Sequence, residues 1–142
     1  MHIIKTLADL HALARNGAVS PEMAEYFEKE LLLLRYSLEP EVPMERFSLD
    51  IHGPIAVLST GEEILKGIGM PGTIRDLMVE WVSSKVIGGI QWYAIFVLAD
   101  NDYMLQIYVP HDGLSPDLDE WLAEQAEEDE RGEGRQPEGE PF

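Results

Sequence analysis

Ser48, Asp50 and His52 have the residue types of a hydrolytic triad, in which a base activates a hydroxyl nucleophile. They alternate with apolar residues over positions 47–52, which is the pattern of a half-buried strand. Side chains that neighbour each other on one strand face are about 6.6 Å apart, too far for a hydrogen bond between nucleophile and base. We therefore interpret the three residues as the polar outer face of an amphipathic strand.

Asp50 and His52 also belong to a possible metal-binding set with His111 and Asp112. Two histidines and two aspartates would suit zinc or iron, provided that the ends of two predicted strands align. Asp102 cannot join His111 in such a site, because nine residues of extended strand separate them by about 30 Å. Isolated surface histidines are the interpretation we adopt, so no bound metal is predicted.

Gly67, Gly69 and Gly72 match the glycine spacing of a dinucleotide-binding loop. Such a loop must follow a strand directly and open a helix, whereas a short helix is expected before Gly67. Gln91 lies where an acidic partner for the ribose is needed, about twenty residues downstream. We interpret the glycines as a connection between two helices and predict no cofactor; a weaker anion site at Thr73 is the alternative.

Two predicted helices begin the chain. The first spans about residues 2–16, and the second opens with Ser20 as its cap, Pro21 in its first turn and Glu22 near its positive end. Residues 31–34 of the second helix are all leucine, so this part is apolar on every side. We expect it to be buried on several sides.

The strongest pattern of the chain spans Val86 to Pro110, where two apolar runs meet at Asn101 and Asp102. These two residue types tolerate the positive φ of a two-residue hairpin turn, which would pair Ala99 with Met104. One face of this hairpin is then wholly apolar and the other is mixed. We expect the mixed face to be only partly covered, by a helix or by another copy of the chain.

The mixed face of the hairpin supplies the candidate partner-binding residues. An exposed apolar patch is unusual for a monomer and predicts self-association, most simply as a homodimer. The C-terminal helix, which opens at Ser115, adds an aromatic residue able to reach a partner. The predicted partner-binding residues are Tyr93, Ile95, Val97, Met104, Tyr108 and Trp121.

These elements predict an α+β fold in the order α-α-β-β-α-α-β-β-α. Its antiparallel sheet has about four strands, arranged as two hairpins, with helices packed on one side. The remaining predicted elements are strands at 47–51 and 55–58, helices at about 59–66 and 73–82, and a final helix from Ser115 to about Asp129. Residues 1–129 are expected to form a single domain and residues 130–142 an acidic flexible tail.

The composition restricts the class of partner. The 142 residues carry a net charge of −17, of which eleven acids and two arginines contribute −9 after position 116. Such a chain repels nucleic acids and anionic membranes and favours basic proteins. The absence of cysteine excludes disulfides and thiolate metal sites, and no apolar run suits a membrane span or signal peptide, so a cytoplasmic location is expected.

We therefore predict a non-catalytic, acidic protein-binding module of the adaptor, inhibitor or immunity-like kind, acting on a basic protein partner. The alternative is a small enzyme or a ligand- or metal-binding protein. Its site would be built from Asp50, His52, His111 and Asp112, or from the Gly67–Thr73 loop. A deep pocket lined by those residues favours the alternative, whereas a flat acidic or apolar patch favours the module.

Overall fold

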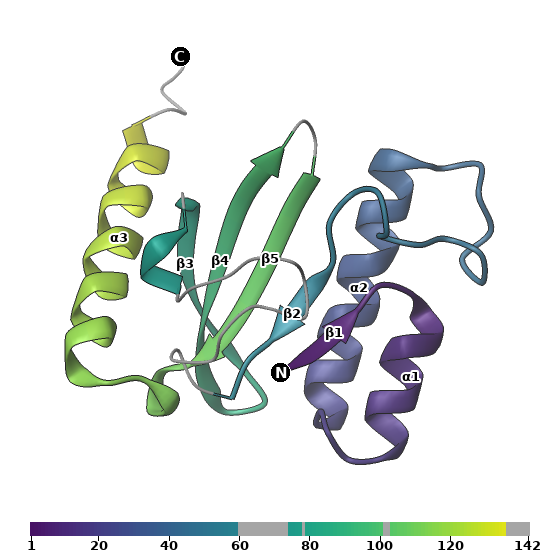
Figure 1. The fold of residues 1–142 in the computed structure, drawn as a ribbon, viewed down its shortest axis with the longest axis horizontal. Helices are drawn as coiled ribbons and strands as arrows, with labels where there is room; N and C mark the ends of the chain where they lie inside the picture. Colours follow the sequence, from purple (N-terminus) through teal and green to yellow (C-terminus); the bar gives the residue numbers. More distant parts are fainter. Residues whose placement is uncertain (60–73, 78, 101–102, 136–142) are drawn as a thin grey trace.

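The computed structural model describes residues 1–59, 74–77, 79–100 and 103–135 (Figure 1). Over these residues the chain is α+β, as predicted, with three α-helices and a five-stranded sheet. The elements are β1 (His2–Ile4), α1 (Leu7–Arg15), α2 (Pro21–Leu38), β2 (Ile55–Val57), β3 (Val79–Ile87), β4 (Ile90–Asp100), β5 (Tyr103–Pro110) and α3 (Pro116–Arg135), with 3-10 turns at Ile74–Asp76 and His111–Gly113.

The sheet is mixed, with the strand order β1-β2-β5-β4-β3. β2 runs parallel to β5, and the other neighbouring strands are antiparallel. The predicted sheet of about four antiparallel strands is therefore wrong in strand number and in the direction of one pair. The difference arises because β1 adds an edge strand and β3 extends the central hairpin to three antiparallel strands.

Helices cover both faces of the sheet rather than one (Figure 1). Trp92 and Ala94 of β4 belong to the core under α1 and α2, which includes Phe27. Tyr93, next to them in the strand, belongs to the core under α3, which includes Leu122. Successive strand residues point to opposite faces, and both faces of β4 are apolar, so each face needs its own cover.

The first helix begins later than predicted, because a capping box determines its start. The Thr6 hydroxyl accepts a hydrogen bond from the Asp9 backbone N–H at 3.1 Å, and the Asp9 carboxylate accepts one from the Thr6 N–H. Residues 2–4 precede this cap and pair with β2 instead. Ser20 caps α2 as predicted, with its hydroxyl accepting from the Met23 N–H at 3.2 Å.

β3 (Val79–Ile87) overlaps two predicted elements. The sequence predicts a helix up to about residue 82 and a strand that begins at Val86. Gly88 and Gly89 have φ values of 61° and 79°, and they form the two-residue turn between β3 and β4. β3 therefore ends at Ile87, which pairs with Ile90, the first residue of β4. The helical spacing of apolar residues before the turn did not form a helix, because strand pairing with β4 uses the same residues.

Residues 47–51 do not form the predicted strand. Phe47 and Leu49 are buried, but the segment runs through turns, and the Leu49 N–H donates to the Lys5 carbonyl at 2.9 Å. The following strand, predicted at 55–58, is confirmed as β2. The irregular segment gives the chain a loop beside the start of β5.

A register shift in β4 changes which residues share a face. The predicted turn residues Asn101 and Asp102 lie outside the described part of the chain. Asp100 pairs with Tyr103, but Leu98 then pairs with Met104 in place of the predicted Ala99. The shift is a bulge of one residue, and one extra residue exchanges the two faces of a strand relative to its partner. Tyr93, Ile95 and Val97 consequently share a face with Leu105, Ile107 and Val109.

Within the described part of the chain, none of the helices combines the length and the apolar character that crossing a membrane requires. The helix predicted from Ser115 is α3, which continues to Arg135, past the predicted end at about Asp129. The Ser115 hydroxyl accepts from the Leu118 N–H at 3.3 Å at its start.

Candidate functional site

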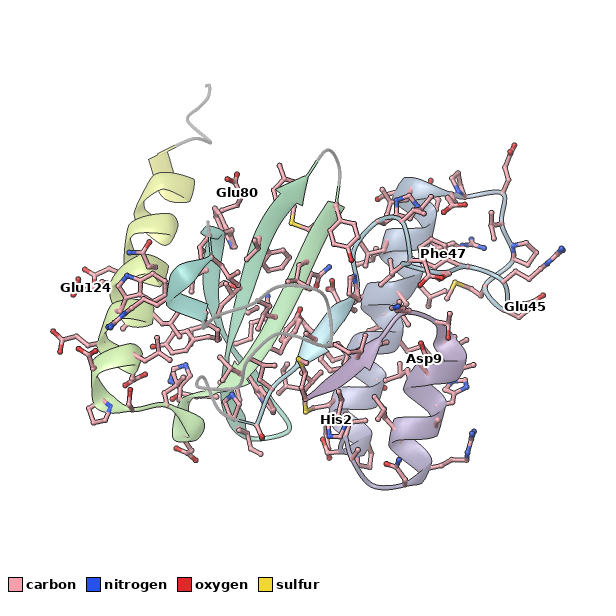
Figure 2. All side chains as sticks on the ribbon, in the orientation of Figure 1. His2, Asp9, Glu45, Phe47, Glu80 and Glu124 are labelled. Atoms are coloured by element: carbon pink, nitrogen blue, oxygen red, sulfur yellow. The ribbon has the colours of Figure 1, made fainter. Side chains whose placement is uncertain are left out.

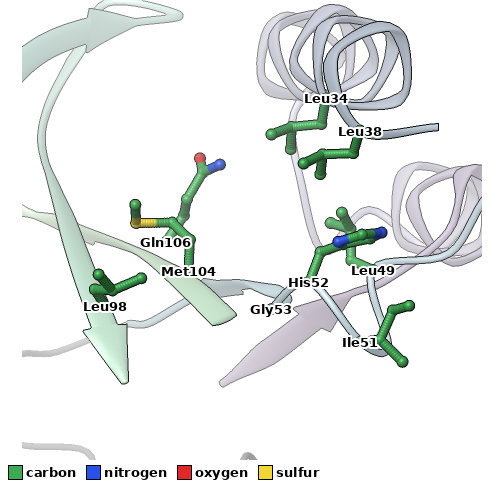
Figure 3. Close-up of a pocket in the computed structure, with 9 residues that line it drawn as sticks. All are labelled: Leu34, Leu38, Leu49, Ile51, His52, Gly53, Leu98, Met104 and Gln106. Atoms are coloured by element: carbon green, nitrogen blue, oxygen red, sulfur yellow. The ribbon is translucent and has the colours of Figure 1, made fainter. Parts of the chain in front are cut away.

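A pocket of about 700 Å³ opens between the last turn of α2, the loop before β2 and the end of the β4–β5 hairpin (Figure 3). Most of the side chains that line it are apolar. The lining residues are Leu34, Leu38, Leu49, Ile51, His52, Gly53, Leu98, Met104 and Gln106. We refer to this cavity as the α2-end pocket.

α2 provides one wall of the pocket. Leu34 and Leu38 are four residues apart, so they lie on the same side of the helix, one turn after the other. Leu31, one turn earlier, is fully buried in the core beneath. The wall is thus the continuation of the core stripe of α2 beyond the point where the sheet covers it.

The loop of residues 49–53 provides the opposite wall and is held tightly against β5. The Met104 N–H donates to the His52 carbonyl at 2.7 Å, and the Gly53 N–H donates to the Leu49 carbonyl at 2.8 Å. Gly53 has φ of 109°, and a Cβ atom there would overlap the Met104 carbonyl oxygen. Only glycine satisfies both conditions, so the shape of this wall depends on Gly53.

His52 connects this loop to the end of α2. Its Nε2 atom lies 2.6 Å from Oε2 of Glu39, the residue that follows α2, and its ring stacks on Phe47 at 6.3 Å between centroids. The His52 side chain is 16% exposed and that of Glu39 is 34% exposed. The pair therefore joins the two walls at the edge of the pocket.

The floor of the pocket carries the one buried polar residue of the described chain, Gln106. Its side-chain Oε1 atom accepts a hydrogen bond from the Tyr108 hydroxyl at 3.3 Å. The Tyr108 hydroxyl lies 3.1 Å from that of Tyr26 on α2. Burial, followed by the hydrogen bond with Tyr26, raises the pKa of Tyr108 above its usual range. Both tyrosines are therefore neutral at physiological pH.

Exposed apolar side chains lie on the rim of the pocket and on the outer side of α2. Leu31 alone of the four consecutive leucines is buried, so the expectation that this part of α2 is covered on several sides is wrong. The outer side of α2 exposes Leu32, Leu33 and Tyr36, and the pocket rim exposes Leu38, Ile51 and Leu98. Each of these six residues is between 41% and 74% exposed. We call the six together the α2-end surface.

Four of the six predicted partner-binding residues lie inside the chain's own core. Tyr93, Ile95 and Val97 are buried under α3, and Tyr108 is buried under α2, so the prediction that they form an exposed face is wrong. The register shift in β4 and the position of α3 explain this difference. Binding of a partner through these residues stays a prediction.

The other two predicted partner-binding residues are half-buried. Met104 lines the α2-end pocket, beside the loop of residues 49–53. Trp121 packs against the core under α3, on the opposite face of the sheet. Met104 is therefore the predicted residue that belongs to the site described here.

The four residues of the possible metal-binding set do not converge. His52 lies beside the start of β5 and His111 follows its end, and eight strand residues span about 24 Å. Asp50 forms an ion pair with Lys5 at 3.3 Å. The described residues contain no group of three histidine, aspartate or glutamate side chains that could hold a metal ion.

His111 lies in a separate cluster on the α3 side. Its ring stacks on Tyr93 with 3.9 Å between centroids, and its Nε2 atom lies 3.4 Å from the Ser84 hydroxyl. Ser48, of the possible triad, accepts a hydrogen bond from the Asp50 N–H at 3.1 Å, a local turn contact. The Gly67–Thr73 loop lies outside the described residues.

Most residues of the pocket are absent from the predicted partner-binding set, which shares only Met104 with the pocket lining. The signal for Leu34 was present in the run of leucines at 31–34, because the helix needs only some of them for its core, and Leu38 lies one turn further on the same side. Leu98 lines the pocket beside Met104 because of the bulge in β4, which the residue pattern does not indicate.

Comparisons with protein-family models, with curated proteins and with solved structures found no match for this chain. The function is therefore inferred from the geometry and the charge of the site.

Proposed function

We propose that the chain is an acidic protein-binding module that holds an apolar segment of a basic partner on the α2-end surface. The observation that carries this proposal is an apolar pocket with three exposed apolar side chains on its rim and three more on the outer side of α2 (the pocket is drawn in Figure 3, and all described side chains in Figure 2). Exposed apolar surface of this kind, surrounded by polar residues, is typical of sites that bind other proteins.

The distribution of the exposed leucines favours a protein over a small molecule as the main occupant. Leu32 and Tyr36 lie on the side of α2 opposite its core stripe, outside the pocket. A small ligand in the pocket would leave them in water. A protein segment that passes around the end of α2 can cover them and also insert one side chain into the pocket, which is how anchor residues bind at protein interfaces.

The charge of the chain specifies the class of partner. Glu39 lies at the pocket edge, Asp50 precedes Ile51 of the rim, and Glu41 and Glu45 are exposed in the segment after α2. A net charge of −17 attracts a basic partner and increases its rate of association. The same charge opposes a second copy of the chain, which is the alternative occupant.

A displayed peptide library tests this proposal with the full-length chain as bait. We expect enrichment of peptides with an apolar anchor flanked by lysine or arginine. Leu33→Glu and Leu98→Glu should each weaken binding of an enriched peptide by about tenfold or more, because each introduces a charge into the apolar contact. Val86→Glu is the matched control, because Val86 is equally exposed but lies on β3.

Two results would contradict the proposal. One is an absence of enriched peptides. The other is binding that falls equally in all three variants, which would indicate a general effect of negative charge rather than contact with the α2-end surface.

Small-ligand binding is the second candidate function. The volume of the pocket lies within the range of about 300–1,000 Å³ that is typical of ligand sites. Among the described residues of the predicted alternative site, His52 is the one that lines it. A small ligand would lose affinity in Leu98→Glu, on the pocket rim, but not in Leu33→Glu, which lies outside the pocket.

A further inference from the structure

Gln106 is an unusual residue for the floor of an apolar pocket. Its side chain is 4% exposed, and no other polar residue of the described chain is buried. Its neighbours in the lining include Leu34, Leu98 and Met104 (Figure 3). A buried amide destabilises a protein unless its donors and acceptors are paired, so an apolar residue would serve the fold at lower cost.

The tyrosines beneath the pocket determine how the amide is oriented. The Tyr108 hydroxyl has one hydrogen and donates it to Oε1 of Gln106, so the Tyr26 hydroxyl must be the donor in its contact with Tyr108. This chain of two hydrogen bonds uses the acceptor side of the amide. The backbone N–H of Gln106 is also used, because it donates to the Pro54 carbonyl at 3.2 Å.

Gln106 lines the pocket, and the side-chain hydrogen bond that it makes among the described residues uses Oε1, so its side-chain N–H groups are the donors that it can offer to an occupant. An occupant that leaves these N–H groups unpaired binds less favourably, because a buried donor without a partner raises the free energy of the complex. An occupant that presents an oxygen forms a hydrogen bond instead. A carboxylate or phosphate oxygen would supply an acceptor, but the net charge of −17 repels it. The matching group is a neutral oxygen at the tip of an apolar body.

We infer that Gln106 determines the specificity of the α2-end pocket and that the partner inserts a tyrosine side chain, whose hydroxyl accepts from the Gln106 amide. Tyrosine joins an apolar ring to an acceptor oxygen, and it is enriched among the residues that dominate protein interfaces. This inference rests on the proposed function, since it assigns the anchor of the same partner. Tyr108 and Tyr26 are then positioning residues, which hold the amide in place.

Side-chain analogues test the inference without the partner. p-Cresol carries the tyrosine ring and hydroxyl, and toluene carries the ring alone. We expect p-cresol to shift the NMR resonances of the Gln106 side-chain amide and to bind the full-length chain about tenfold more tightly than toluene. That ratio corresponds to about 1.4 kcal/mol, within the range for one hydrogen bond.

Two substitutions of Gln106 assign the preference to its N–H groups. Gln106→Met keeps the length and removes all polar atoms, and Gln106→Glu keeps the acceptor for Tyr108 but removes the N–H donors. Both should reduce the preference for p-cresol to about twofold or less. Thermal unfolding shows which of the two variants retains the fold, and the binding result is taken from that variant. Tyr108→Phe should reduce the preference partly, because the amide loses its fixed orientation.

Equal binding of p-cresol and toluene to the unmodified chain would overturn the inference, as would a preference that survives in Gln106→Met. Neither result bears on the proposed function, which fails separately if the peptide library shows no enrichment. Enrichment of basic peptides with leucine or phenylalanine anchors would support the protein-binding module but would show that tyrosine is not its anchor.

Discussion

Nε2 of His52 lies 2.6 Å from Oε2 of Glu39, and this single contact joins the loop before β2 to the end of α2. The two residues are thirteen positions apart in the chain, and the pocket opens between the segments to which they belong. The pocket walls are therefore held together at one edge by a polar contact and elsewhere by apolar packing.

The first prediction concerns this contact. His52→Ala should lower the free energy of unfolding by about 1 kcal/mol, the usual contribution of one part-buried hydrogen bond, and should weaken peptide binding. His11→Ala is the matched control, because His11 lies 3.7 Å from Glu28 with both side chains half exposed. Urea unfolding of the two variants measures the difference. Equal destabilisation would show that the His52 contact has no special role in the pocket wall.

A second prediction concerns Gly53, which combines a positive φ with close approach to Met104. Gly53→Ala should destabilise the fold by more than about 2 kcal/mol, because the strain of the backbone adds to the overlap with the Met104 carbonyl. Gly17→Ala is the control, since Gly17 has φ of 79° but no atoms within 4 Å of the added Cβ. It should cost only about 1 kcal/mol. A Gly53→Ala protein as stable as Gly17→Ala would mean that the loop moves freely away from β5.

Local signals in the sequence predicted parts of the fold, whereas contacts made through the tertiary fold could not be predicted. Ser20 and Ser115 marked the starts of α2 and α3 correctly, because cap and first-turn residues act locally. Gly88 and Gly89 are a hairpin signal of the same local kind, but the predicted strand from Val86 runs through them. His52 and Glu39 meet only through the tertiary fold, so no sequence pattern predicts their contact.

The candidate site depends on a β-bulge, which the sequence also did not predict. The bulge between Leu98 and Asp100 adds one residue to β4 and places Leu98 beside Met104 at the pocket rim. Nothing in the residue types distinguishes this register from the predicted one, because both give one apolar face. The packing of α3 on one face and α2 on the other selects between them.

A third prediction follows from the tyrosines. Burial, with smaller contributions from the Asp119 charge and hydrogen bond, raises the pKa of Tyr93 to about 12. The unfolded chain loses this proton near pH 10, before the folded chain does. Tyr93 therefore adds stability that is fully present below pH 10 and is lost as the pH rises towards 12.

Unfolding midpoints measured across this alkaline range test the assignment. Tyr93→Phe should show a smaller loss of stability between pH 10 and 12 than the unmodified chain, although it also loses the 3.2 Å hydrogen bond to Asp119. Tyr103→Phe is a suitable control, because Tyr103 has a half-buried side chain and lies outside both cores. An identical pH profile for all three proteins would contradict the expected role of Tyr93.

The fourth prediction concerns the acidic C-terminus. Truncation after Glu130 should leave the thermal midpoint unchanged, because the sequence beyond it lacks apolar residues at regular spacing. It should slow association with a basic peptide, and this effect should fade as salt shortens the screening length from about 10 Å at 0.1 M. A lower melting temperature would mean that the removed residues pack on the fold. A salt-independent loss of binding would mean that they make a specific contact.

NMR mapping of a library-selected basic peptide on the full-length chain tests the central claim most directly. The proposal predicts that the largest shifts on binding occur at the end of α2, in the loop of residues 49–53 and at Leu98 and Met104 around the pocket. Leu98→Glu should abolish these shifts, and Val86→Glu should preserve them. Shifts confined to α3 or to the β3–β4 turn, or shifts at the pocket that persist in Leu98→Glu, would contradict the claim that the α2-end surface is where this chain binds its partner.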